Sequence, residues 1–241
     1  MYDLNTFGLR DMTECGAALR KLGVGASTLE QAADRIVRYL YEHLVEKHSG
    51  EKSCVLVRFF KTHRCGDLDS RLLEAARCML GPIPDYPEMK CLILMATAGM
   101  KPEWNARQQS VGHQVIPLAS PEMVIRSPMI SQLVRQFGLD PSAVLEPAPE
   151  LLVDMQQKTF NVFHVEQAVG SPFVPAQDEF VIPCGVQSVL GFGGMLPSGN
   201  LFAVILFSKV RIPRQTADLF KTLSLSVKAA VLPLAESAVF A

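Results

Sequence analysis

The sequence predicts an α/β (α+β) domain in which helices flank a central, mainly antiparallel sheet. Apolar runs at residues 91–98 and 201–207 have the length of buried strands and fall far short of the roughly 20 apolar residues that cross a bilayer. Other segments carry apolar residues at helical spacing, and residues 197–200 (PSGN) have the composition of a hairpin turn. With 241 residues, 49% of them hydrophobic, the chain can form one large core that holds a small-molecule cavity.

Apolar periodicity predicts the helices. The clearest begins where Ser27 or Thr28 can cap free N–H groups, and Leu29, Ala33 and Ile36 then fall on one face. The predicted helices cover residues 11–22, 27–46, 67–80, 121–137 and about 215–234. In the last one, Phe220, Leu223, Val227, Ala230 and Leu234 form a narrow 3-4 seam, typical of a helix that pairs with a second helix. The alternative is that this seam packs on the sheet.

The strands are predicted from dense apolar and β-branched runs. They cover residues 53–61, 91–97, 112–118, 180–183, 187–195 and 201–209, with the last of these in the centre of the sheet. Gly191, Gly193 and Gly194 fall inside a strand, which indicates a bulge or a close approach of two backbones. About forty residues between Pro141 and Phe180 show poor periodicity, and long irregular segments in compact domains are often functional.

Charge and cysteine usage exclude several classes of protein. The 23 basic and 24 acidic residues balance, so we expect no nucleic-acid binding through a basic face. The first thirty residues contain no apolar signal segment, and no apolar run is long enough for membrane insertion. The six cysteines are scattered and form no CxxC pair, which indicates a reducing compartment and a cytoplasmic protein.

The last third of the chain resembles a GAF-type sensor domain of a bacterial signal-transduction protein. Residues 180–234 follow the closing order of that family: a strand leading to a proline, a glycine-bearing strand, a hairpin, an aliphatic strand and a long helix. More broadly, the resemblance covers residues 27–234 and divides the chain into an N-terminal helical extension (1–26) and a GAF-like sensor domain (27–241). The helix at 67–80, the extra length and the missing cyclic-nucleotide motif depart from the family, so the ligand and any cofactor stay unknown.

The resemblance implies a ligand pocket under the irregular middle and dimerisation through the terminal helices. We expect residues 161–178 to close this pocket, with His164 and Glu166 among its polar lining because strand alternation places both on one face. His164 could bind an anion, ligate a metal or titrate near neutral pH. The alternative is a partly buried histidine bonded to a backbone carbonyl.

Three more residues are candidates for ligand binding. Trp104 could stack on a ligand, Arg107 could bind an anion, and His113 has the same two interpretations as His164. The alternative for this region is a solvated loop that one tryptophan anchors. We find no catalytic motif, and no residues at the spacing of a metal site.

These features favour a small-ligand sensory module of a two-component or related signalling protein, acting as a homodimer. The chain ends in apolar residues (233–241), from which we expect a covalently linked output domain, such as a histidine kinase, to follow. A competing hypothesis is a thiol-dependent redox enzyme similar to the methionine sulfoxide reductases of the GAF family, which needs Cys54, Cys91 and Cys184 to converge at the pocket. A third hypothesis is a purely structural dimerisation domain, which would have no cavity.

Overall fold

A six-stranded antiparallel sheet forms the centre of the computed structural model, which describes residues 1–80, 87–110, 112–145, 161–235 and 240. The strand order is β3-β2-β1-β6-β5-β4, and every adjacent pair is antiparallel. The strands are β1 (Cys54–Arg64), β2 (Lys90–Gly99), β3 (Val115–Leu118), β4 (Phe163–Val165), β5 (Ser188–Met195) and β6 (Leu201–Ser208). β6 lies between β1 and β5, so the predicted fold class and the central place of this strand are confirmed.

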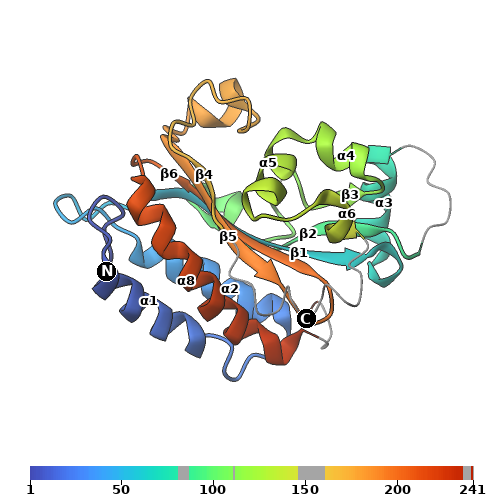
Figure 1. Cartoon of the computed structure of the whole chain (residues 1–241), viewed down its shortest axis with the longest axis horizontal. Coiled ribbons are helices and arrows are strands. Elements are labelled where there is room, and N and C mark those ends of the chain that lie inside the picture. Colours follow the sequence, from blue (N-terminus) through green and yellow to red (C-terminus); the bar gives the residue numbers. More distant parts are fainter. Residues whose placement is uncertain (81–86, 111, 146–160, 236–239, 241) are drawn as a thin grey trace.

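Long helices cover one face of the sheet, which we call the helix face (Figure 1). They are α1 (Leu9–Lys21), α2 (Leu29–His43) and α8 (Arg214–Val231). The Thr28 hydroxyl accepts the N–H of Gln31 at 3.3 Å and so caps α2 as predicted. α2 packs on β1 and β2, α8 packs on β5, and α1 lies along α8, which places the largest core of the molecule on this face.

Shorter segments cover the opposite face, which we call the pocket face. They are α4 (Pro121–Arg126), α5 (Pro128–Gln136), α6 (Pro141–Leu145) and a π-helical turn, η3 (Gln177–Val181). The helix α3 (Ser70–Leu80) lies beside β3 at the edge of the sheet. Short segments leave room over a sheet, whereas long helices fill it, so any ligand space is expected on the pocket face. Within the described part of the chain, no helix combines the length and apolarity needed to cross a membrane.

Three sequence predictions need correction. The predicted helix at 121–137 is two helices, because Pro128 disfavours helical geometry at Ser127 and starts α5. The predicted strand at 180–183 is instead the end of η3 and a turn. The strand predicted at 112–118 begins only at Val115, because Gly112 and His113 have positive φ angles of 82° and 58°. The short strand β4 was not predicted, and residues 146–160 of the irregular middle lie outside the described residues.

The glycines of β5 permit a close approach of backbones. The pairing of β5 with β6 runs without a register shift from Ser188 to Met195, so no bulge is present. A Cβ at Gly193 would collide with the carbonyl oxygen of Phe202, and a Cβ at Gly191 would lie 2.8 Å from Cδ1 of Ile205. The close approach of two backbones is therefore confirmed at Gly193, whereas Gly191 leaves room for the side chains of Ile205 and Phe163.

The seam of α8 is part of the core of the chain. Phe220, Leu223 and Val227 are fully buried, and the Phe220 ring lies 5.2 Å from the rings of both Phe7 and Phe192. The seam therefore packs on the sheet and on the N-terminal segment, which leaves it covered within one chain. A homodimer stays a prediction, and its surface would have to be another face.

Candidate ligand-binding site

A cavity of about 540 Å³ lies between the pocket face of the sheet and the segments α4, α5, α6 and η3. Strand alternation explains its floor, because Leu56, Arg58 and Phe60 of β1 all point to this side. The walls are mostly apolar and include Leu92, Ile116, Leu133, Val134, Ala203, Ile205 and Phe207. A cavity of this size with apolar walls and few polar groups has the properties of a small-molecule site.

Arg58 places a positive charge on the floor of this cavity. The residue is only 8% exposed, and its Nη2 donates a hydrogen bond to the Ser110 hydroxyl at 3.0 Å. Its Nε has no hydrogen-bond partner, and no carboxylate forms an ion pair with it, among the described residues. Burial lowers the pKa of Arg58 to about 10, so the guanidinium is charged at neutral pH without a counter-charge.

A second polar group without a partner lies next to Arg58. Thr97 of β2 is directly opposite Arg58 of β1, so both side chains share the pocket face. Thr97 is 1% exposed, and its Oγ1 has no hydrogen-bond partner within the described parts of the chain. Buried polar groups are normally hydrogen-bonded, but Thr97 is not among the residues that line the cavity, so of the two it is Arg58 that a ligand in the cavity could contact.

His113 contributes a neutral polar group to the wall. It follows Gly112, and the positive φ angles of both residues turn the loop toward the cavity that they line. Desolvation, and next the charge of Arg58, lower the pKa of His113 below its ordinary value of 6.5. The neutral ring can therefore donate from one nitrogen and accept at the other.

Aromatic residues and two opposite charges lie elsewhere around the cavity. Trp104 is buried at its wall in an edge contact with Phe180, with 5.6 Å between the ring centroids. Arg126 of α4 and Glu179 of η3 also line the cavity and are themselves exposed. A ligand could therefore contact the buried Arg58 inside the cavity and the exposed side chains of Arg126 and Glu179, which carry opposite charges, at its wall.

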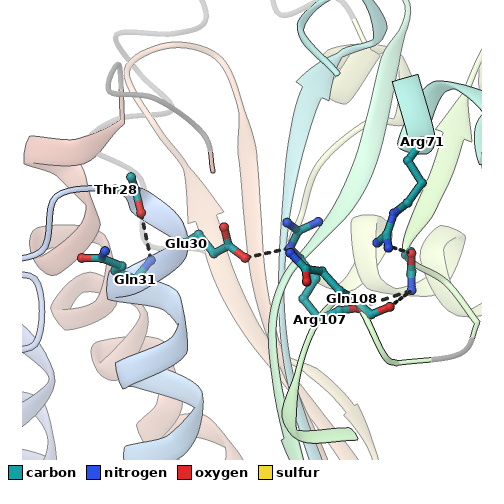
Figure 2. Close-up of polar contacts among 7 residues, drawn as sticks. Thr28, Glu30, Gln31, Arg71, Arg107 and Gln108 are labelled. Carbon is teal, nitrogen blue, oxygen red and sulfur yellow. Dashed lines mark hydrogen bonds and ion pairs between the residues drawn. The ribbon is translucent and has the colours of Figure 1, made fainter. Parts of the chain in front are cut away.

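The structure brings two of the predicted site residues to the cavity, Trp104 and His113, and places Arg107 elsewhere. Figure 2 shows Arg107 pointing toward α2, where its Nε donates to Oε1 of Glu30 at 2.9 Å. The side chains of this pair are 8% and 21% exposed, and the guanidinium also lies over the ring of Phe240 at 4.1 Å. Arg107 is not among the residues that line the cavity, and its contacts tie the loop before β3 to α2.

His164 and Glu166 also lie outside the lining of the cavity. The Nε2 of His164 is 2.9 Å from the carbonyl oxygen of Ile212, so this nitrogen carries the proton and donates. Desolvation is the largest cause of a lowered pKa at His164, and the ring is half-buried. These contacts are those of the alternative interpretation, a histidine bonded to a carbonyl, while Glu166 is exposed. Other residues of the irregular segment, Pro172 and Pro175, do line the cavity.

Sequence reasoning missed Arg58, although the sequence contained the signal. A single arginine interrupts the apolar run of residues 54–60, and charged residues are almost never buried without a reason. Such a residue in the middle of a predicted central strand should have been a candidate for anion binding.

Cys54, Cys91 and Cys184 do not converge at the cavity. Cys54 and Cys91 are fully buried in the core of the helix face, whereas Cys184 packs against the core of the pocket face. The convergence that a thiol-dependent enzyme requires is therefore missing for these three residues. Among the residues that the structure describes, no group of three or more histidine, cysteine or acidic side chains could hold a metal ion.

Comparison with known proteins finds a likeness among solved structures. No protein-family model matches the chain, and no curated protein matches it. Among solved structures, it is similar to the GAF domain of a phosphoenolpyruvate-protein phosphotransferase from Coxiella burnetii, with 13% sequence identity over 93% of each chain and a TM-score of 0.47. At this identity and TM-score, neither family membership nor a function of the chain follows from the likeness.

Proposed function

We propose that this chain is a small-ligand-binding regulatory domain and that its ligand occupies the cavity on the pocket face. The observation that carries the proposal is the cavity itself, about 540 Å³ with apolar walls and a buried, unpaired Arg58 on its floor. A buried charge without a counter-charge destabilises a folded protein. A ligand group that interacts with Arg58 would offset this cost.

We propose further that His164 transmits the effect of ligand binding from the cavity to α8. α5 forms a wall of the cavity, and the Gln136 side chain at its end accepts the backbone N–H of His164 at 2.6 Å. His164 in turn donates to Ile212, two residues before α8 begins. This series of contacts connects the cavity wall to a terminal helix, which could pass the signal to a linked output domain or to a second copy of the chain.

The proposal is tested with a neutral apolar dye, such as Nile red, and with the emission of Trp104, the only tryptophan in the chain. The wild type should bind the dye, and Ala203→Phe should abolish binding because the added ring fills the cavity floor. Ala229→Phe adds the same ring on the exposed side of α8 and is the matched control. Equal dye binding by the two variants, both folded by circular dichroism, would contradict the proposed site.

The transmission step has a separate test in hydrogen exchange. Ligand binding should slow amide exchange in the first turn of α8 in the wild type. His164→Leu should retain dye binding and lose this protection, because the leucine cannot donate to Ile212. Protection of α8 that persists in His164→Leu would exclude His164 as the connection.

A further inference from the structure

The surroundings of Arg58 specify what the cavity binds. Arg58 lies between Leu56 and Phe60 along β1, with Ile205 of β6 on one side and Thr97 of β2 on the other. It is therefore a charged group in the middle of an otherwise apolar floor. Among the described residues, one neutral acceptor, the Ser110 hydroxyl, bonds to this group, while a guanidinium offers five N–H donors in a planar fork.

We infer that the cavity binds an amphipathic monoanion, with a carboxylate head on Arg58 and an aliphatic or aromatic body along the apolar floor and walls. This rests on the proposed function and names the ligand class for the same site. A carboxylate can accept two parallel N–H bonds from one guanidinium, and such charge-assisted pairs are among the strongest hydrogen bonds in proteins.

A single negative charge fits this site better than two. Arg58 is the only buried cation among the described residues that line the cavity, because Arg126 is exposed. His113 is neutral at neutral pH, and the exposed, opposite charges of Arg126 and Glu179 at the wall offset each other. A phosphate dianion on Arg58 would leave one charge uncompensated in an apolar space, which is costly.

The body of the ligand is apolar for the same kind of reason. Besides Arg58, its partner Ser110 and His113, most surfaces near the head group belong to aliphatic and aromatic side chains such as Leu56, Phe60 and Ile205. Each methylene group transferred from water to such a surface contributes about 0.8 kcal/mol. A polar body, such as a sugar or nucleoside, would lose its hydration without gaining hydrogen bonds.

The test compares probes that share one apolar chain and differ in the head group. Octanoate, 1-octanol and octyl phosphate are titrated below their aggregation limits at pH 8, with binding followed by Trp104 emission and by calorimetry. Octanoate should bind wild type about ten- to hundredfold more tightly than 1-octanol, the range expected for a charge-assisted pair. It should also bind more tightly than octyl phosphate, which is mainly a dianion at this pH.

Variants at two arginines of β1 assign the preference to one residue. Arg58→Met keeps the length of the side chain and should erase the difference between octanoate and 1-octanol. Arg64→Met, at the exposed end of the same strand, should leave that difference intact. Arg58→Gln is used if Arg58→Met does not fold, and the comparison of probes in the wild type needs no variant.

Four outcomes would overturn the inference. These are equal affinity of the wild type for octanoate and 1-octanol, tighter binding of octyl phosphate, an unchanged preference in Arg58→Met, and no binding of any octyl probe. If Nile red still binds and Ala203→Phe still blocks it, only the anionic ligand class fails. If the dye does not bind either, the proposed function fails as well.

Discussion

Arg58 and Lys61 are two buried cations on the same strand, and they differ in what surrounds them. Arg58 points to the pocket face, where it lines a cavity and, within the described part of the chain, has one neutral hydrogen-bond partner. Lys61 points to the helix face and is 2% exposed, with its Nζ 3.3 Å from Nε2 of His63. Neither cation forms an ion pair with a carboxylate among the described residues.

The difference lies in the space that each charge can reach. Desolvation lowers the pKa of Arg58 to about 10 and that of Lys61 to about 8, so burial penalises both charges. Arg58 can regain stabilisation from a ligand because empty volume lies beside it. Lys61 is enclosed by core side chains and meets a second buried base, His63, whose pKa falls to about 3 through desolvation and the charge of Lys61. A buried charge is therefore an indication of a ligand site only where a cavity accompanies it.

The largest expected effect is a loss of stability at acid pH, caused by His63 on the helix face of the sheet. Unfolded His63 takes up a proton near its ordinary pKa of 6.5, whereas the folded residue stays neutral down to about pH 3. The unfolded state thus binds more protons in this range, and stability falls as the pH drops. Between pH 6.5 and 4.5, the free energy of unfolding should decrease by about 2–3 kcal/mol from this residue.

Urea denaturation at several pH values measures this contribution. The decrease should be smaller in His63→Gln by that amount, whereas His48→Gln, which replaces an exposed histidine, should follow the wild type. Parallel pH curves for His63→Gln and the wild type would mean that His63 is protonated as easily in the fold as outside it.

A smaller expected effect is the change in the free energy of unfolding when either buried cation, Lys61 or Arg58, is replaced. Lys61→Met and Arg58→Met should each raise the free energy of unfolding of the ligand-free protein at pH 7 by about 1–3 kcal/mol, since each removes a buried charge that forms no ion pair among the described residues. The gain from Lys61→Met should shrink between pH 8 and 10.5. In this range folded Lys61 has lost its proton while the unfolded side chain keeps it, so wild-type stability rises with pH.

Ligand binding then distinguishes the two variants. Lys61→Met should bind octanoate as the wild type does, because Lys61 is on the other face of the sheet, whereas Arg58→Met should lose its preference for the anion. Measurements of unfolding and of octanoate affinity on the same samples check both parts. Loss of octanoate binding in Lys61→Met would mean that the two faces are not independent.

Most of the fold could be predicted from the sequence, because its central strands and long helices have strong periodicity. The run of residues 201–207 is apolar at every position, which is typical of a central strand, and α2 combines a cap at Thr28 with one apolar face. Local sequence could not predict β4, since three residues are too few for a pattern and pairing with β5 defines the strand. The candidate site was more difficult to predict than the fold. Arg58, Thr97 and Ser110 are far apart in the chain and come together only through strand register and a loop contact.

The smallest expected effect concerns the rates at which the cysteine thiols react, which report how accessible each face of the sheet is to solvent. Cys78 is exposed and should react with a thiol reagent such as DTNB within seconds to minutes at pH 8, and partly buried Cys184 should follow more slowly. Cys15 and Cys54 should stay unreacted until the protein unfolds, since burial raises the pKa of each thiol to about 12 and the thiolate is the reactive form.

Octanoate should slow only the labelling of Cys184, which packs on the pocket side, and should leave that of Cys54 unchanged. Mass spectrometry of labelled peptides, with Cys78→Ser as the control for the fast phase, identifies each site. Rapid labelling of Cys54 in the folded protein would show that the helix face opens, and the contrast between Arg58 and Lys61 would then lose its basis.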